Sequence, residues 1–239
     1  MYRKLALIDS KRHAELKWKP PEEPHSFLKH DHFIPLGIHE VDAIASIAPV
    51  FFSNKPVSDI VMVTALTNGQ NHFVDEQGCW VDDVVPLAVQ AYPLHYQSKN
   101  PGFTDYAVLV DEQAPGLQKE QGRAILKKDG QLSKVLSTQF DALKSLIDHH
   151  KRKVDFLGAL RRHELLEPRT IKLSSEDGPK ITLNGLLVVN TDAFDALDAE
   201  LRQQFDEKGW TGLIQRHVQS IKRLDVLYDM AAKNLSKTH

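Results

Sequence analysis

Residues 59–66 read Asp-Ile-Val-Met-Val-Thr-Ala-Leu, a short apolar run with several β-branched residues. A run of this kind predicts a buried strand. Similar β-rich runs lie at 50–53, 72–75 and 106–111, and turn residues such as Asn68-Gly69 separate them. Because short strands joined by tight turns pair side by side in opposite directions, we predict a largely antiparallel sheet.

Helical periodicity follows in the second half of the chain. Apolar residues recur every three or four positions over 132–160, which predicts one long helix that ends before Pro168. Upstream, a short strand is expected at 33–36 and a small helix at 39–48. A further helix is expected at 83–92, with a proline in its first turn.

A hairpin and two helices complete the pattern. Residues 170–173 and 181–189 form β-rich runs joined by turn residues. Two amphipathic helices follow, the first capped by Thr191 or Asp192 and stopped by Gly209. The predicted fold class is therefore α+β, a largely antiparallel sheet with a long helix and a C-terminal helix pair packed on it.

Composition predicts a single domain over residues 1–239. Apolar residues make up 41% of the chain and charged residues 26%, which is enough apolar surface to form a core. Three prolines just before His25 indicate that residues 1–25 form an extended arm. Residues 113–130 are polar, contain three glycines and lack periodicity, so we expect a mobile loop there. Residues 233–239 are expected to fray.

Charge and cysteine content exclude several classes of function. The formal net charge is -2, so no basic field favours a nucleic-acid partner. The single cysteine, Cys79, excludes an internal disulfide and a thiolate metal site. No Walker or Gly-x-Gly-x-x-Gly motif is present, which argues against nucleotide binding by those routes.

No signal peptide or transmembrane segment is evident in the sequence. The apolar stretch before Asp9 is too short for a signal-peptide core, and no uncharged apolar run approaches the roughly 18 residues of a spanning helix. We therefore expect no membrane insertion and a cytoplasmic location. Export by a non-classical route is an open alternative.

Histidines suggest a metal site as an alternative reading. His30 and His32 would share one face of a strand, so both imidazoles can reach one ion, with His39 or His95 as a third ligand. That set would suit iron or zinc in an oxygenase-type enzyme. The simpler reading treats these histidines as solvated residues of an extended segment, and under it we expect no cofactor.

Basic residues gather in the long predicted helix. Lys151–Lys153 and Arg161-Arg162 are expected to project over several faces and to be solvated, with phosphate contact as the alternative. The neighbouring pair His149-His150 is also expected at the surface, because two adjacent helical side chains point about 100° apart and cannot chelate one ion together.

The stretch Gly-Gln-Asn-His-Phe-Val-Asp-Glu-Gln-Gly-Cys-Trp at 69–80, followed by Tyr92-Pro93, carries the most distinctive motif. Together with segments over nearly the whole chain, it resembles the bacterial SapC family. The family usually has an Arg-Arg pair before its Tyr-Pro element, whereas this chain has Gln90-Ala91. The resemblance therefore carries no role of those arginines over to this chain.

The same block supplies the candidate binding residues, which are Asn71, Asp75, Trp80 and Tyr92. Physically, Asp75-x-x-Gly78-x-Trp80 suits a tight turn, because the carboxylate accepts backbone N–H bonds, glycine takes a positive φ and tryptophan covers the core. This turn chemistry requires no catalytic role. Ligand or partner recognition is the functional alternative for these residues.

The resemblance implies a protein without an established catalytic activity. The SapC family is named after a gene linked to a bacterial surface layer, and its members are often encoded beside modification enzymes. We therefore expect a non-enzymatic binding or accessory protein with a protein or peptide partner. The alternatives are an exported surface-layer component and the metal-dependent enzyme that uses His30, His32 and His39.

Overall fold

The structure is a computed structural model that describes residues 1–54, 59–66, 71–174 and 180–236, with side chains up to residue 232. Three sequence-based expectations fall wholly or partly outside these residues. They are the turn at Asn68-Gly69, the turn of the hairpin at 174–179 and the frayed end at 233–239.

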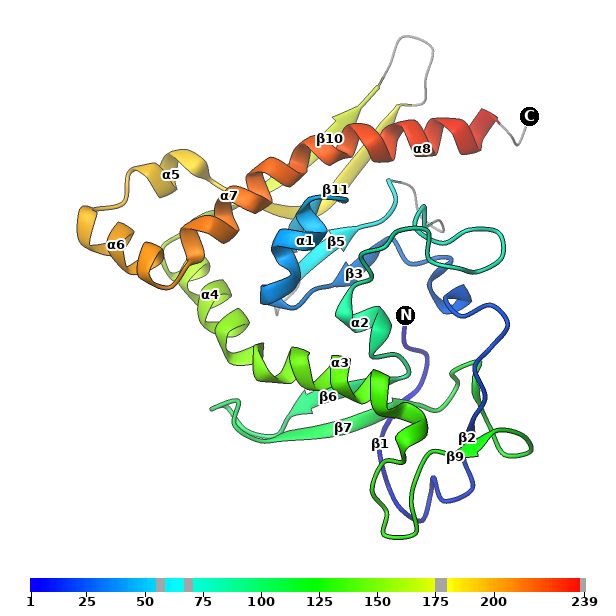
Figure 1. The fold of residues 1–239 in the computed structure, drawn as a ribbon. Helices are drawn as coiled ribbons and strands as arrows, with labels where there is room; N and C mark the ends of the chain where they lie inside the picture. Colours follow the sequence, from blue (N-terminus) through cyan, green and yellow to red (C-terminus); the bar gives the residue numbers. More distant parts are fainter. Residues whose placement is uncertain (55–58, 67–70, 175–179, 237–239) are drawn as a thin grey trace. The chain divides into compact units, whose positions relative to one another are not determined.

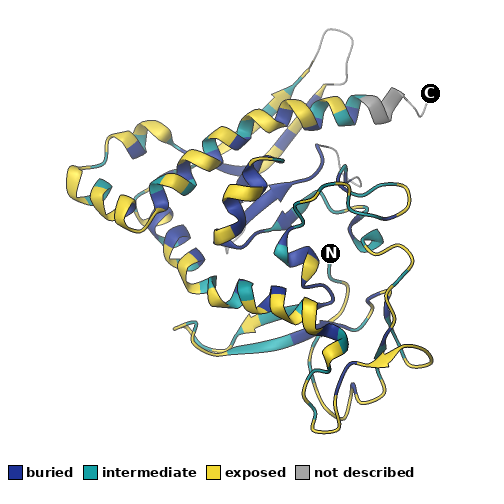
Figure 2. Ribbon diagram, viewed as in Figure 1, coloured by how far each residue is buried: buried dark blue, intermediate teal, exposed yellow. Residues whose placement is uncertain are grey.

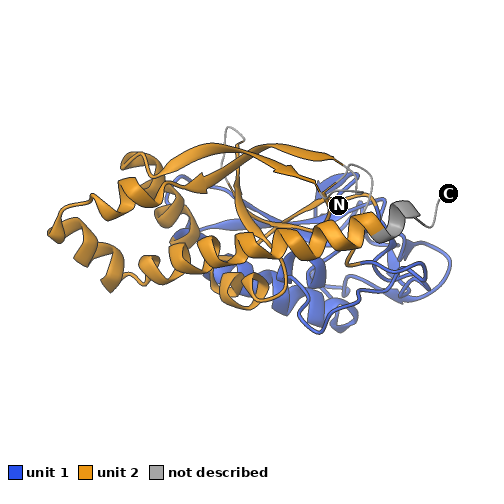
Figure 3. Ribbon diagram, turned by 90° about the horizontal axis from the view of Figure 1, so that it is seen from above, with its two compact units in different colours: residues 1–29, 74–151 blue, residues 30–73, 152–239 orange. Residues whose placement is uncertain are grey.

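The chain packs as two compact units, each built from two separate stretches of sequence (Figure 3). Unit 1 contains residues 1–29 and 74–151, and unit 2 contains residues 30–73 and 152–239. The description of the whole chain as one domain stays a prediction. Each unit is described separately below.

Unit 2 is organised around a five-stranded antiparallel sheet with the order β10-β11-β4-β5-β3. The central strands β4 (Val50–Ser53) and β5 (Ile60–Val63) are buried along their whole length (Figure 2). Continuous apolar runs suit strands that are covered on both faces. The predicted α+β class with antiparallel sheets is confirmed. Strand β3 covers Phe33–Pro35.

The predicted hairpin is present in unit 2 as β10 (Leu166–Leu173) and β11 (Ile181–Val189). Strand β10 begins earlier than expected and includes Pro168, which the sequence had suggested as a helix terminator. Strand β10 lies at the edge of the sheet, where the missing N–H of a proline is tolerated.

Helices cover the sheet of unit 2 (Figure 1). The 3-10 helix η2 (Ile38–Glu40) leads into α1 (Val41–Ala45), which packs on α7 (Trp210–Ser220). Helix α7 also contacts β4 and β11. The remaining helices are α5 (Thr191–Asp195), α6 (Ala199–Glu207), η4 (Ile221–Arg223) and α8 (Leu224–Ser236). None of the helices in the described residues is long and apolar enough to cross a bilayer.

The C-terminal helices begin and end differently from the prediction. Asn190, not Thr191 or Asp192, caps α5, because its side-chain oxygen accepts a hydrogen bond from the N–H of Ala193. Asp198 then caps α6. Gly209, with φ +70°, separates α6 from α7 as expected.

Unit 1 contains two small antiparallel sheets. The first has the order β1-β7-β6 and consists of β1 (Leu5–Leu7), β7 (Tyr106–Asp111) and β6 (Leu94–Ser98). Helix α3 (Ser137–Asp148) packs on β6 and on the short helix α2 (Leu87–Gln90), and the 3-10 helices η1 (Ser26–Leu28) and η3 (Lys134–Leu136) complete the unit. The second sheet joins β2 (Lys17–Trp18) to β8 (Leu117–Gln118) and β9 (Arg123–Ala124).

The segments expected to be an arm and a loop contain these paired strands. Residues 1–25 contribute β1 and β2, and residues 113–130 contribute β8 and β9. Two glycines of the latter segment are explained by Trp18: a Cβ on Gly116 would lie 2.6 Å from its ring, and one on Gly122 would lie 2.4 Å from its carbonyl oxygen. The mobility of 113–130 stays a prediction.

Three predicted elements are shorter than expected. The long helix over 132–160 is wrong as one element, because it is interrupted at His149 and continues as α4 (His150–Arg162). The helix expected at 83–92 is reduced to α2 after Pro86. The strand expected at 72–75 is reduced to one isolated bridge between Val74 and Trp80.

Candidate functional site

The turn from Asp75 to Trp80 has the local geometry that the sequence predicts. The Oδ1 atom of Asp75 accepts a hydrogen bond of 2.7 Å from the N–H of Cys79. Gly78 has φ +71°, and a Cβ there would lie 2.6 Å from the Cβ of Glu23. Glycine is therefore required both by the backbone angle and by the close approach of another segment.

Trp80 is half-buried, and both of its N–H groups donate to residues nearby. Its backbone N–H donates to Nδ1 of His25 at 3.0 Å, and its indole N–H donates to the carbonyl of Val84 at 3.1 Å. Burial lowers the pKa of His25, which favours the neutral imidazole that can accept this bond. The arrangement ties the end of the 1–25 segment to the turn.

Tyr92 lies in a separate aromatic and acidic environment of unit 1. Its ring stacks on Phe27 with the ring centres 3.6 Å apart, and its hydroxyl donates to Oδ2 of Asp111 at 3.2 Å. Burial, and then the negative charge of Asp111, raise the pKa of Tyr92. The phenol therefore stays protonated and serves as a hydrogen-bond donor. The peptide bond from Tyr92 to Pro93 is cis.

Asn71 belongs to unit 2, whereas Asp75, Trp80 and Tyr92 belong to unit 1. The Oδ1 atom of Asn71 accepts a hydrogen bond of 2.9 Å from the N–H of Phe73. Each of the four candidate residues thus has an internal partner that accounts for its side chain structurally. Their role in ligand or partner recognition stays a prediction.

Of the histidines considered for the alternative metal site, His30, His32 and His39 lie in unit 2, whereas His95 lies in unit 1. His30 and His39 are exposed, and the ring of His32 lies 4.2 Å from the ring of Phe33. Within the described residues, no group of three His, Cys, Asp or Glu side chains is arranged to hold a metal ion. The iron or zinc site at His30, His32 and His39 therefore has no geometric support from these residues.

Two carboxylates at the end of β7 form the polar centre of unit 1, and the sequence analysis missed both. Asp111 is fully buried and accepts hydrogen bonds from the backbone N–H groups of Arg3, Lys4 and Gln113, in addition to the phenol of Tyr92. It thereby fixes the residues just before β1. The detectable signal was an Asp-Glu pair directly after an apolar strand.

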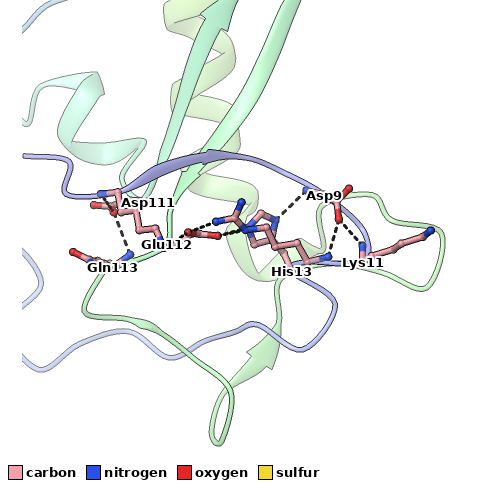
Figure 4. A network of polar contacts seen from close by, with 8 residues as sticks. Asp9, Lys11, His13, Asp111, Glu112 and Gln113 are labelled. Carbon is pink, nitrogen blue, oxygen red and sulfur yellow. Dashed lines mark hydrogen bonds and ion pairs between the residues drawn. The ribbon is translucent and has the colours of Figure 1, made fainter.

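Glu112 is the centre of an ion-pair network (Figure 4). Its oxygens contact the Arg12 guanidinium at 2.5 and 2.7 Å, the Lys4 ammonium at 3.1 Å and Nε2 of His13 at 3.1 Å. The hydrogen bond from Arg12, followed by those from Lys4 and His13, lowers the pKa of Glu112 to about 2. The carboxylate is therefore ionised at any physiological pH.

Hydrogen bonds also indicate the tautomer of the neutral His13 ring. Its Nδ1 accepts from the N–H of Asp9 at 3.0 Å, so in the neutral ring the proton lies on Nε2 and is donated to Glu112. Asp9 in turn accepts from the backbone N–H groups of Arg12 and Lys11, which lower its pKa. The network holds the segment after β1 against the end of β7.

In unit 2, the side chain of His217 forms a buried polar bridge between a helix and the sheet. It is almost fully buried, its Nδ1 donates to the carbonyl of Val50 at 2.7 Å, and its Nε2 accepts from the N–H of Val189 at 3.2 Å. Burial lowers the pKa of His217 to about 4. A neutral imidazole thus joins α7 to β4 and β11, and Ser220 Oγ accepts from the N–H of Val50 beside it.

Lys153 corrects the expectation of a solvated basic cluster. Its side chain is nearly buried, and the ammonium donates to Oδ1 of Asp59 at 2.8 Å and to the carbonyl of Leu36 at 3.2 Å. His150 also differs from the surface residue expected, because it is half-buried against Tyr96 and Tyr106. Only part of the basic cluster is exposed.

The edge of the first sheet of unit 1 carries exposed apolar side chains. Among the described residues there are five exposed large apolar side chains. Two of them lie on β1, Leu5 (38% exposed) and Leu7 (57%), and a third, Phe140 (36%), lies on α3. Phe140 lines a groove of about 460 Å³ together with Ile8, Val108 and Leu132. No sequence motif had drawn attention to this surface.

The backbone of β1 is open on the side away from β7. The carbonyl of Lys4 and the N–H of Ile8 are bonded to β7. Because antiparallel pairing alternates along a strand, the backbone groups of Leu5 and Leu7 point outward. Strand β1 is an edge strand in the sheet order, so it presents hydrogen-bonding groups and apolar side chains together.

Comparison with known proteins gives one positive result. The SapC family profile matches residues 8–227 of the 239-residue chain. The chain belongs to the SapC family. Searches of curated proteins and of solved structures gave no match. Membership in SapC confirms the resemblance that residues 69–80 and the Tyr-Pro element suggested.

Proposed function

We propose that this SapC protein is a non-enzymatic binding protein, and that strand β1 pairs with an extended segment of a partner protein. The observation that carries the proposal is that exposed Leu5 and Leu7 lie on an open strand edge, with the groove at Phe140 on the other face. Proteins usually protect such edges with charged residues, prolines or covering loops. An unprotected apolar edge is typical of a surface that another chain covers.

The groove next to β1 supports the same proposal. Side chains of an added strand would alternate between the two faces of the sheet. On one face they would meet the groove at Ile8, Val108 and Phe140, and on the other they would meet Leu5 and Leu7. Strand addition of this kind takes affinity from main-chain hydrogen bonds and specificity from alternate side-chain pockets.

The hydrogen-bond partners of the candidate residues Asp75, Tyr92 and Asn71 give no support for a catalytic role. Asp75 and Tyr92 use their polar atoms to fix a turn and to hold Asp111, and Asn71 caps its own backbone. These contacts explain the residues as parts of the scaffold. A protein partner also fits the role of an accessory protein that acts with modification enzymes or with a surface layer.

Affinity capture tests the proposal. Full-length protein would be immobilised as wild type, as the double variant Leu5→Lys with Leu7→Lys, and as the control Val226→Lys, which changes an exposed apolar residue of α8. We expect one protein from the native host extract to be retained by wild type and by the control, and lost from the β1 variant. Equal retention by all three would contradict the proposal.

The same material distinguishes a partner from self-association. If the occupant of β1 is a second copy of the chain, sedimentation of purified wild type will show a dimer that the β1 variant loses. Fractionation of the host cell addresses location, since a surface-layer component would be labelled from outside and a cytoplasmic accessory protein would not.

A further inference from the structure

A second groove, of about 770 Å³, lies in unit 2 and takes no part in the proposal for β1. It is lined by residues of α4 and of the junction between α6 and α7, helices that are labelled in Figure 1. Helix α4 contributes Arg152, Arg162 and Gly158, and the junction contributes Lys208 and Trp210.

The groove is lined by more basic than acidic side chains. Within the part of the chain that the structure describes, Arg152 and Arg162 form no ion pair. The Lys208 ammonium lies 4.4 Å from the centre of the Trp210 ring, which holds it by a cation–π contact. Two carboxylates, Asp155 and Glu207, also line the groove, and Glu207 accepts a hydrogen bond from Gln203.

The spacing along α4 places these residues on one face. Steps of three or four residues keep positions 152, 155, 158 and 162 within an arc of about 120° around the helix. An α-helix rises about 1.5 Å per residue, so the ten steps from Arg152 to Arg162 span about 15 Å.

Gly158 opens the middle of this face. A Cβ added at Gly158 would meet no atom within 4 Å, so the missing side chain leaves space above the helix. Glycine inside a helix costs roughly 1 kcal/mol relative to alanine. Among the described residues, no packing contact requires glycine at this position. The missing side chain instead leaves the groove open between Arg152 and Arg162.

We propose that this groove binds an acidic, extended segment of a partner protein. A separation of about 15 Å matches four or five extended residues at about 3.3 Å each. Arginine is suited to carboxylates, because its guanidinium donates two parallel hydrogen bonds to one carboxylate. Asp155 and Glu207 interrupt the row of cations, which disfavours a continuous nucleic-acid backbone, whereas single carboxylates of a peptide can face the two arginines separately. This site is independent of β1.

Fluorescence anisotropy with a labelled hexaglutamate peptide at low ionic strength tests the site on the full-length protein. We expect saturable binding that weakens roughly tenfold in Arg152→Glu with Arg162→Glu, since two charge-assisted contacts are lost. The matched control is Lys222→Glu with Arg223→Glu, which changes the net charge equally on exposed residues outside the groove. It should bind like wild type. Equal weakening in both pairs, or no binding by wild type, would overturn the proposal.

A second variant tests the shape of the groove without changing charge. Gly158→Phe should abolish hexaglutamate binding, whereas Gly158→Ala should keep it and slightly raise the unfolding temperature. Tighter binding of a DNA oligonucleotide through the same arginines would also overturn the proposal. The Leu5→Lys, Leu7→Lys variant should bind hexaglutamate normally, so failure of one proposal leaves the other untouched.

Discussion

Unit 1 and unit 2 hold their buried polar groups by different chemistry. In unit 1, the carboxylates of Asp111 and Glu112 accept hydrogen bonds from backbone N–H groups, a phenol and basic side chains at the end of β7. In unit 2, the neutral imidazole of His217 and the hydroxyl of Ser220 bridge α7 to the sheet. These two bridges differ in charge, although unit 2 also contains the ion pair between Lys153 and Asp59.

The difference follows from how much apolar surface each sheet buries. Strands β4 and β5 of unit 2 are buried at every residue, so a charged bridge there would carry a large desolvation cost. Strand β1 of unit 1 is half exposed and short, and polar contacts to its flanks compensate for limited packing. The two units should therefore respond differently to mutation and to pH.

The largest expected effect comes from Asp111→Ala in unit 1. Three backbone N–H groups and the Tyr92 phenol would lose their acceptor in a buried site, which should cost about 4 kcal/mol of unfolding free energy. Glu112→Ala, which removes more exposed ion pairs, should cost only about 1 kcal/mol. Urea unfolding of both variants measures the difference, and equal losses would show that Asp111 is not the anchor of β1.

A pH titration addresses unit 2. His217 has a folded-state pKa of about 4 against an ordinary value of 6.5. The unfolding free energy therefore keeps the full contribution of His217 above pH 6.5. It falls as the pH drops from 6.5 to 4, because in that range only the unfolded chain binds a proton at His217. The loss is on the order of 3 kcal/mol.

Tryptophan fluorescence can report this loss selectively. Trp210 is in unit 2, whereas Trp18 and Trp80 are in unit 1. Unfolding would be followed in a Trp18→Phe, Trp80→Phe background, with His217→Asn as the control that should lose the pH dependence. A flat profile between pH 6.5 and 4 in the parent protein would contradict the role assigned to His217.

Alanine substitution of one glycine with positive φ in each unit separates the cost of the backbone angle from the cost of a close contact. Gly78→Ala in unit 1 meets both a left-handed φ and the Cβ of Glu23, so we expect a loss of about 2 to 3 kcal/mol. Gly185→Ala in unit 2 has φ +79° with no atom within 4 Å, so only about 1 kcal/mol should be lost. Thermal unfolding of the two variants would show a smaller shift for Gly185→Ala, and the reverse order would count against the close approach of Glu23.

Glu112 gives unit 1 a different pH window. Its pKa falls from 4.5 to about 2 on folding, so its contribution is present above pH 4.5 and disappears as the pH falls toward 2. With Trp210→Phe leaving only the reporters of unit 1, the effect should be about 1 kcal/mol and absent in Glu112→Gln. A loss already complete at pH 5 would rule out Glu112 as its source.

The smallest expected effect is on the stability of the proposed binding edge. Leu7→Lys changes an exposed side chain and should shift the unfolding free energy by no more than about 0.5 kcal/mol. Urea unfolding of this variant would verify that loss of a partner reflects the surface and not unfolding of unit 1. A larger loss would mean that Leu7 supports the sheet itself.

Sequence reasoning succeeded where structure depends on neighbours along the chain. Strands β4 and β5, the hairpin β10–β11 and the stop at Gly209 follow from apolar runs and local turn chemistry. The turn at Asp75 to Trp80 was also predictable, because its bonds join residues a few positions apart.

It failed where distant segments decide the outcome. Strand β1 exists because β7 pairs with it, and Lys153 is buried because Asp59 lies opposite it, and neither partner is visible from local periodicity. The interruption of the long helix at His149 falls inside an apolar repeat that continues on both sides. The exposed edge at Leu5 and Leu7 was hidden for the same reason, since it was interpreted as an arm.

The pairing of β1 with β7 has a consequence for the order of synthesis. Lys4 and the carboxylate of Asp111 that holds it are 107 residues apart. A growing chain therefore exposes the apolar segment around Leu5 to Ile8 until β7 has left the ribosome, and long-range strand pairing of this kind is slow. During that interval the segment is exposed without its β7 partner, so apolar residues that the finished sheet holds in one register can pair with other chains.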